Sequence, residues 1–316
     1  MLPTHSAPGS RFAILVALLA SSCFSVTFIV NRAIGVAGGH WVWTAALRYA
    51  WVLLLLSLWF VMRWQLGGVL RAFRAHWLFW TVAGTVGVGL FYAPLAYAPT
   101  LAPGWVVACT MQFTILATPL VLLMFGARVR RSGVLLLAII FAGIVLVNLD
   151  RRDASATVQV LGVLPVVLSA FAYPFGNQLL QEARSGGGRW IPRLDDEVTA
   201  NATARVLLMT IGSIPFWLLT LLLPHSPAPT RQQVAGTLIV ALFGTIGNAL
   251  FLFARQMGGR DPNAVARVDA TQSSYTAMTL LGEVVLLNTA LPGAIGFAGL
   301  VLVLGGLAFY TIRTGS

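Results

Sequence analysis

The chain has 316 residues, of which 58% are hydrophobic and only 9% are charged. Its mean hydropathy of +0.85 excludes an ordinary soluble globular protein. All twenty basic residues are arginine, and the net charge is +11. This balance would suggest nucleic-acid binding in a soluble chain, but most of these arginines lie between apolar runs, where they act as topology signals. The composition predicts a polytopic membrane protein that contacts a lipid bilayer and no nucleic acid.

Ten apolar runs are each long enough to cross a bilayer of about 30 Å, which takes about 20 helical residues. They lie near residues 12–33, 41–62, 77–98, 104–124, 133–149, 158–181, 203–223, 233–254, 263–287 and 292–312. The first run continues past a lipoprotein-like cleavage sequence that ends at Cys23, so we expect it to remain as a span. Cys23 and Cys109 both lie within apolar runs and predict no disulfide or metal site.

The two halves of the chain are similar to each other. Three pairs of segments match in order, at offsets of 160, 156 and 157 residues: GTVG 84–87 with GTIG 244–247, FAGIVLV 141–147 with FAGLVLV 297–303, and AALR 45–48 with ATAR 202–205. Because five is an odd number, a second five-helix copy enters the membrane from the opposite side, as in secondary transporters with a site near the midplane. We expect an all-α membrane protein with ten transmembrane helices as two inverted five-helix repeats, residues 1–150 and 151–316. The glycine-rich connection at 182–200 predicts a flexible cytoplasmic linker.

The placement of arginine predicts the orientation, because short cytoplasmic loops retain positive charge. With the amino terminus inside, thirteen arginines lie on cytoplasmic segments: Arg11, Arg63, Arg71, Arg74, Arg128, Arg130, Arg131, Arg184, Arg189, Arg193, Arg255, Arg260 and Arg313. Four lie outside: Arg32, Arg151, Arg152 and Arg231. We expect a multi-pass protein of the bacterial inner membrane with both termini in the cytoplasm.

The ninth run carries three ionisable residues, Arg267, Asp269 and Glu283. A charge at the bilayer centre costs roughly 2.5 to 3.5 kcal/mol on insertion scales, so such residues usually face a cavity or a partner. Asp269 and Glu283 lie on one stripe of a helical wheel, with Gln272 beside them, and stand roughly 21 Å apart along the axis. They therefore serve different depths of the membrane. The alternative is that these groups only hold helices together.

Two further arginines lie inside spans. Judged by position along the predicted spans, Arg48 lies at nearly the same membrane depth as Glu283. Arg205 and Arg267 lie at nearly the depth of Asp269. We hypothesise ion pairs at both levels, because an unpaired buried charge is strongly destabilising. Such pairs could be structural locks without a transport role. Asp269 is the leading candidate for coupling, since a buried carboxyl group can alternate between a proton and a ligand.

Polar and aromatic residues within spans are weaker candidates for the same cavity. Aromatic faces could receive a flat or cationic substrate, with plain packing as the alternative for each. The aromatic candidates are Phe91, Tyr92, Trp105, Tyr173, Phe175 and Tyr275. The polar ones are Gln112 and Asn177.

Several segments resemble those of the drug/metabolite transporter superfamily, and more narrowly its bacterial multidrug resistance efflux transporter family. They are NR at 31–32, GGHWVWTAALRY at 38–49, GLFYAP at 89–94, PGWVVACTMQFTI at 103–115, GVLPVVLSAFAYPFGN at 162–177, VDATQS at 268–273 and LGE at 281–283. The resemblance covers nearly the whole chain. It implies secondary active export of small organic, drug-like or cationic compounds by alternating access, with protons as a candidate coupling ion.

The chain departs from the family in one respect. Related small multidrug resistance exporters rely on a glutamate in the first helix, whereas the first span here has no acid and the sixth has none before Glu182. If a membrane carboxylate performs that role, it must be Asp269 or Glu283.

Other functions remain open at this stage. A second transport function is export or import of a metabolite such as an amino acid or a sugar derivative. A membrane-embedded enzyme is disfavoured, because the sequence has no metal-ligand spacing, no nucleophile with a nearby histidine and no nucleotide-binding loop. A receptor or scaffold would not need charges inside an inverted repeat. We expect no cofactor, and the sequence does not distinguish a monomer from a homodimer.

Reporter fusions test the predicted orientation. Fusions placed after Arg11, Arg131 and Arg260 should all report a cytoplasmic location, because these positions follow the inner ends of spans in an inverted ten-helix arrangement. Enzymatic reporters active on only one side of the membrane provide the measurement. A periplasmic signal from two of the three fusions would rule out the inverted-repeat arrangement.

Overall fold

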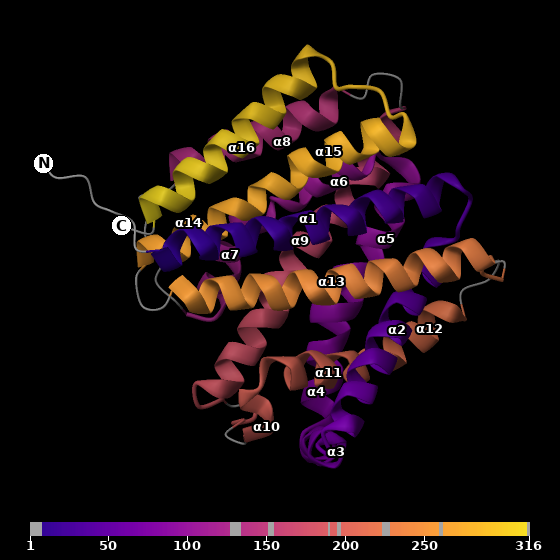
Figure 1. Cartoon of the computed structure of the whole chain (residues 1–316), viewed down its shortest axis with the longest axis vertical. Helices are drawn as coiled ribbons and strands as arrows, with labels where there is room; N and C mark the ends of the chain where they lie inside the picture. The colour runs from indigo at the N-terminus through magenta and orange to yellow at the C-terminus, as the bar shows by residue number, and fades with distance from the viewer. Residues whose placement is uncertain are drawn as a thin grey trace, which may run out of the picture.

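A computed structural model describes residues 8–126, 134–150, 155–188, 190–194, 197–222, 228–258 and 262–314. Every regular element in these ranges is helical, and no strand occurs in them. The predicted topology signals Arg128, Arg130, Arg131, Arg151, Arg152, Arg189 and Arg260 lie outside the described residues. Two long helices, α1 (Pro8–Val36) and α13 (Arg231–Gly258), lie side by side across the middle of the bundle (Figure 1).

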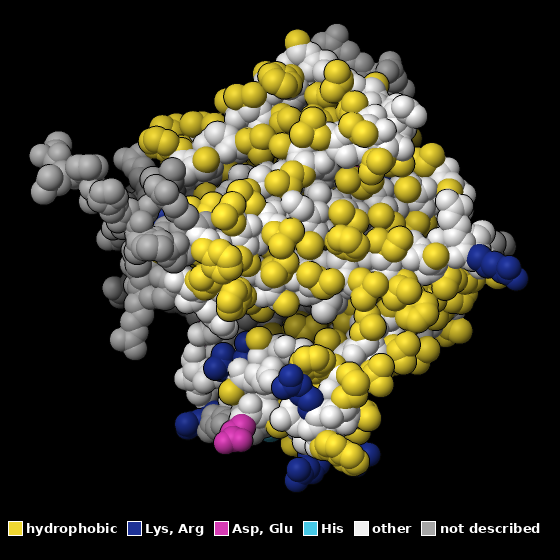
Figure 2. All heavy atoms as spheres, viewed as in Figure 1, with side chains coloured by type: hydrophobic (Ala, Val, Ile, Leu, Met, Phe, Trp, Pro, Cys, Tyr) yellow, Lys and Arg dark blue, Asp and Glu magenta, His cyan; other side chains and the backbone are white. Residues whose placement is uncertain are grey.

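Seven segments of the described chain are long and apolar enough to cross a membrane: Phe12–Val36, Trp41–Met62, Trp77–Leu101, Gly104–Met124, Ala156–Arg184, Ala202–Leu221 and Arg231–Met257. Two shorter apolar helices, Leu135–Leu149 and Ala294–Phe309, match the predicted fifth and tenth runs. The ninth predicted run is interrupted, as described below. The face of the molecule shown in Figure 2 is largely hydrophobic over α1, α13, α15 (Ser274–Leu287) and α16 (Ala294–Thr314), as a bilayer requires.

The first half of the chain contains α1, α2 (Trp41–Met62), α3 (Leu66–Ala75), α4 (Trp77–Gly84), the π-helical η1 (Thr85–Leu90), α5 (Phe91–Leu101), α6 (Gly104–Met111), α7 (Thr114–Met124) and α8 (Val134–Leu149). Pro94 cannot donate a hydrogen bond to the carbonyl of Leu90, and the π turn ends at that residue. The sequence analysis missed α3, a short amphipathic helix that buries Val69 and Ala72.

The second half contains α9 (Ala156–Arg184), α10 (Glu197–Ala200), α11 (Ala202–Gly212), α12 (Ile214–Leu221), α13, α14 (Pro262–Ala270), the 3₁₀ turn η3 (Thr271–Ser273), α15 and α16. Hydroxyl groups explain the break at η3. Thr271, Ser273 and Ser274 donate to the backbone oxygens of Val268, Ala270 and Thr271 at 2.6 to 2.7 Å. Such local bonds compete with regular helix geometry and tighten the turn.

The described part of the predicted linker at 182–200 packs against the core, while its flexibility stays a prediction. The backbone N–H of Leu194 donates to the Ala183 oxygen at 2.8 Å, and the Leu194 side chain is buried in the main core. Gly186 and Gly187 supply positive φ values of 126° and 70°, which let the chain fold back. Arg189, Asp195 and Asp196 lie outside the described residues.

The helices α8 and α16 pack closely because two glycines face each other. A Cβ atom at Gly143 would lie 2.7 Å from the Gly299 oxygen, and one at Gly299 would lie 2.6 Å from the Gly143 oxygen. Small residues allow such close approach between membrane helices, where lipid provides no hydrophobic drive for association. At the end of α8, Asp150 accepts a hydrogen bond of 2.7 Å from the Gly293 N–H, just before α16.

Substitutions on one helix test this contact. Gly299→Ala should lower the stability of the purified protein by roughly 1 to 3 kcal/mol, because the added methyl group overlaps a backbone oxygen. Gly305→Ala on the same helix is the matched control, since a Cβ there meets nothing within 4 Å. Thermal unfolding in detergent measures both. Equal melting temperatures for the two variants would show that the α8–α16 contact is loose.

Candidate functional site

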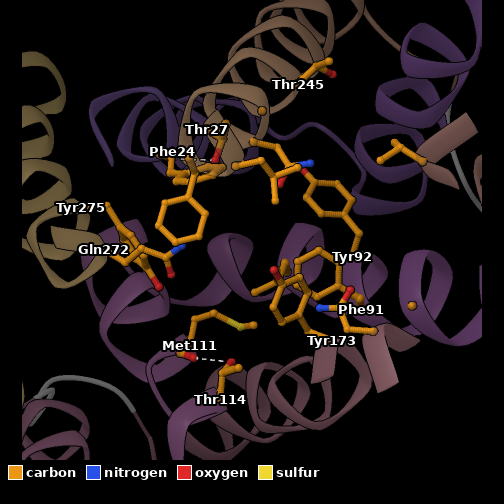
Figure 3. Close-up of a pocket in the computed structure, with 18 of the residues that line it drawn as sticks. Phe24, Thr27, Phe91, Tyr92, Met111, Thr114, Tyr173, Thr245, Gln272 and Tyr275 are labelled. Atoms are coloured by element: carbon orange, nitrogen blue, oxygen red, sulfur yellow. Dashed lines mark hydrogen bonds between the residues drawn. The ribbon is translucent and has the colours of Figure 1, made fainter. Parts of the chain in front are cut away.

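A cavity of about 690 Å³ lies inside the bundle. Both halves of the chain contribute to its wall, and they do so through α1, α2, η1, α5, α6, α7, α9, α11, α13, α14, η3, α15 and α16. Figure 3 shows the lining side chains arranged around an open centre. The volume falls in the range of sites for small organic ligands.

Aromatic rings form much of the cavity wall. Phe91 and Tyr173 lie on one side with ring centroids 5.1 Å apart, while Phe24 and Tyr275 lie on another at 6.5 Å (Figure 3). The Tyr92 hydroxyl is held by the Asn31 side chain, whose Nδ2 donates to it at 2.9 Å. These contacts fix the rings in position before any ligand binds.

Arg48 projects from α2 toward the Tyr92 ring. Its guanidinium carbon lies 3.8 Å from the Tyr92 ring centroid and 5.6 Å from that of Tyr49. Across from it, Gly244 of α13 leaves room for the guanidinium, because a Cβ there would lie 2.6 Å from Nη2. The Arg48 Nε atom is buried without a hydrogen-bond partner among the described residues.

The predicted ion pair between Arg48 and Glu283 is wrong. Glu283 is fully buried and accepts hydrogen bonds from the backbone N–H groups of Gly104 at 2.7 Å and Trp105 at 3.3 Å. These are the first N–H groups of α6, which have no partner within their own helix. Glu283 therefore caps α6 and locks α15 to it, an arrangement that the helix dipole also favours.

Asp269 pairs with Arg255 of α13 rather than with Arg205. Its Oδ1 lies 3.1 Å from the Arg255 Nε, but the angle does not satisfy hydrogen-bond geometry. Arg205 instead donates to the Thr199 and Ala200 oxygens at 2.8 and 3.0 Å. The side chain of Asp269 is 34% exposed, and the pair lines the cavity. Arg267 is exposed on α14.

Two glutamines line the cavity where helices are interrupted. Gln112 stands between α6 and α7, and its Nε2 donates to the Thr276 hydroxyl at 3.3 Å. Gln272 lies within η3. Broken helices expose backbone polar groups, which a membrane protein tolerates only inside protein or around a cavity. The breaks therefore belong to the site.

Nine of the fourteen residues predicted for the site line this cavity: Arg48, Phe91, Tyr92, Gln112, Tyr173, Asn177, Asp269, Gln272 and Tyr275. The other five lie elsewhere in the described structure: Glu283, Arg205, Arg267, Trp105 and Phe175. Trp105 is buried in a second core cluster, against α8, α15 and α16. The sequence analysis missed Arg255, Thr27, Thr245 and Asn248 as lining residues. Thr245 and Asn248 could have been found as polar residues within the eighth span, because Thr245 is part of its GTIG motif and Asn248 directly follows it.

An all-helical, multi-pass membrane protein whose two halves enclose a ligand-sized cavity belongs to the class of membrane transporters. Residues 12–316 match the family model EmrE, described as "Putative multidrug resistance efflux transporter". The chain belongs to this family, which agrees with its resemblance to the drug/metabolite transporter superfamily. Membership implies transport rather than catalysis.

Relatives match along most of the chain. The uncharacterized protein YjlA of Bacillus subtilis (strain 168) is 36% identical over 319 residues, which cover 96% of this chain and 95% of that protein. An uncharacterized 42.1 kDa protein of Shouchella clausii, named for the 3′ region of an intracellular alkaline protease, is 32% identical over 277 residues. The match covers 83% of this chain and 69% of that protein. A crystal structure at 16% identity covers 97% of this chain and 99% of its own with a TM-score of 0.58, which shows the fold alone.

Variants at Glu283 test its role as a helix cap. Glu283→Ala should lower stability by roughly 1 to 3 kcal/mol, because it leaves two buried N–H groups without an acceptor. Glu283→Gln keeps one oxygen acceptor and should lose less. Thermal unfolding of the purified variants measures the difference. Normal stability of Glu283→Ala would show that the cap contributes little.

Proposed function

We propose that the protein is a secondary active transporter that exports a small organic compound by alternating access through this cavity. The observation that carries the proposal is that both halves of the chain, including both sides of the interrupted fourth and ninth spans, line one cavity of ligand size. Drug-like compounds are the first candidates, in keeping with the family description. A metabolite such as an amino acid or sugar derivative is the alternative.

The proposed architecture is ten spans in two inverted repeats, residues 1–150 and 151–316. The glycine contacts of the matched motifs support it. In the motifs GTVG 84–87 and GTIG 244–247, the first glycine packs on the second span of the other half. Gly84 packs against α11, and Gly244 packs against α2. The second glycine packs on the first span of the other half: Gly87 against α9 and Gly247 against α1. Equivalent residues making equivalent contacts are expected from a pseudo-two-fold axis.

The reciprocal contact of Gly143 and Gly299 supports the same axis, because these residues occupy the same place in the motifs FAGIVLV and FAGLVLV. Moreover, α1 begins and α16 ends on the same side of the bundle (Figure 1), as an even number of spans requires. With the arginine distribution, this supports an inner-membrane protein whose termini are both cytoplasmic.

Alternating access requires elements that bend, and the interrupted helices supply them. The π turn η1, the break at Gln112 and the 3₁₀ turn η3 all border the cavity. Each lacks part of a regular hydrogen-bond ladder, so a rotation there disturbs fewer bonds than one in an unbroken helix. We place the hinges at these three points.

Asp269 is the proposed coupling residue. Its pair with Arg255 joins α14 to α13 at the cavity wall, and its Oδ1 atom has no hydrogen-bond partner among the described residues. Protonation of Asp269 would remove the attraction and release Arg255. A proton could thereby shift the balance between two arrangements of these helices.

The substitution Asp269→Asn tests this assignment once a transported compound has been found by screening proteoliposomes under an imposed pH gradient. The variant keeps the side-chain shape but cannot titrate. It should abolish transport driven by the pH gradient while preserving exchange of labelled for unlabelled compound, which needs no net proton movement. Asp150→Asn is the control, because it lies outside the cavity and an amide oxygen can still accept from the Gly293 N–H.

Gradient-driven transport by Asp269→Asn at the wild-type rate would remove Asp269 from the mechanism. Loss of both exchange and gradient-driven transport, with normal thermal stability, would instead place Asp269 in substrate binding.

A further inference from the structure

We propose that the cavity binds a monocarboxylate with an aromatic or apolar body, and that Arg48 binds its carboxylate. This inference rests on the proposed function, because it names the class of compound that the same cavity receives. It differs from the cationic cargo that the family resemblance implies.

The first argument is that the charge of Arg48 is not neutralised by any carboxylate of the described residues. Asp269 pairs with Arg255, and Glu283 caps α6. The guanidinium instead lies over the rings of Tyr92 and Tyr49 and makes a side-chain hydrogen bond with Tyr92, a neutral partner. The attraction of a cation to an aromatic ring offsets only part of the cost of a charge in the membrane interior.

Deprotonation cannot relieve this cost, because the guanidinium of arginine stays charged in proteins. The guanidinium is therefore a permanent cation, and its Nε donor has no hydrogen-bond partner among the described residues. The planar fork of arginine matches a carboxylate through two parallel hydrogen bonds. An anion is the ligand that this site lacks.

The second argument is steric. Tyr92 covers one face of the guanidinium, while Gly244 provides room beside Nη2 that any side chain would fill. Every other residue type at position 244 would bring its Cβ to 2.6 Å from Nη2. The wall around Arg48 is thus shaped to hold the guanidinium at the cavity surface, close to where a ligand would lie.

The third argument is the charge of the described cavity lining as a whole. Its arginine and acidic residues are Arg48, Arg255 and Asp269, which leave one positive charge in excess. A cationic compound would meet Arg48 without a free acid to bind it. The same reasoning disfavours an amino acid, because Asp269 is already occupied by Arg255 and its ammonium group would have no anionic partner. A monocarboxylate needs no such partner.

The fourth argument concerns the body of the ligand. Rings of Phe24, Phe28 and Tyr275 lie across the cavity from Tyr92 and Phe91. These faces suit an aromatic or aliphatic group, and the cavity volume of about 690 Å³ accommodates a compound of this size.

Three small probes that share a phenylpropyl skeleton test the proposal on the full-length protein purified in detergent. They are 3-phenylpropionate, which is an anion, 3-phenylpropylamine, which is a cation, and L-phenylalanine, which adds an ammonium group to the carboxylate. Thermal shift and intrinsic tryptophan fluorescence measure binding. We expect saturable binding of 3-phenylpropionate, at least about 10-fold tighter than that of the other two, because only this probe gains a charge-assisted contact without bringing an unpaired ammonium group.

Variants assign the effect to Arg48. Arg48→Met should weaken binding of 3-phenylpropionate by roughly 10- to 100-fold. Gly244→Ala should weaken it as well, because the methyl group displaces the flexible guanidinium without touching the backbone. Arg63→Met is the matched control and should bind normally, since Arg63 follows the same helix and stacks on Trp59 at 4.3 Å outside the cavity.

The proposal is overturned if 3-phenylpropylamine or L-phenylalanine binds as tightly as 3-phenylpropionate, if none of the three binds, or if binding survives in Arg48→Met. If that variant fails to fold, unchanged binding by Gly244→Ala overturns it. Failure of the proposed function is a separate result. Binding that depends on Arg48, without transport of 3-phenylpropionate in proteoliposomes, would keep the anion site and reject export. Transport of 3-phenylpropylamine alone would keep the proposed transport function and reject the anion site.

Discussion

The structure depends on one constraint, which is that a bilayer offers no hydrogen-bond partners to a polypeptide backbone. Helices can break only where protein or a cavity surrounds the break. The described chain has interruptions at η1, at Gln112 and at η3 that border the same cavity, and one at Ser213, between α11 and α12, that is buried in protein. The start of α6 follows the same rule, because its first N–H groups lie inside the bundle and donate hydrogen bonds to Glu283. At the three breaks that border the cavity, irregular backbone and polar side chains therefore occur together with open space.

Two carboxylates and one arginine of the membrane interior meet the cost of burial in different ways. Glu283 is satisfied by backbone donors, which makes it part of the framework. Asp269 has a single cationic partner and remains partly exposed, so a proton could compete for it. Arg48 has aromatic neighbours and no acid among the described residues. Only the last arrangement leaves a charge for a ligand to neutralise.

An anionic cargo would also fit the energetics of export. A membrane potential that is negative inside favours outward movement of one negative charge by about 2.3 kcal/mol per 100 mV. If protons enter in exchange at Asp269, the same potential favours their movement too. The empty carrier would have to reorient with the Arg48 charge unneutralised, whereas the loaded carrier would not. Binding of the carboxylate would then lower the barrier to reorientation of the loaded carrier.

Hydrophobic length and polar residues within apolar runs are local properties, so the class of protein, the positions of most spans, the matched motifs and nine of the lining residues could be predicted from the sequence. Only the tertiary structure decided the partners of the charges. A helical wheel assumes 100° per residue, but the three residues of η3 turn by about 120° each, so the phase between Asp269 and Glu283 shifts by roughly 60°. The N–H groups that hold Glu283, and the glycine that makes room for Arg48, belong to helices distant in sequence. Their proximity is set by packing depth and rotation, which no local pattern encodes.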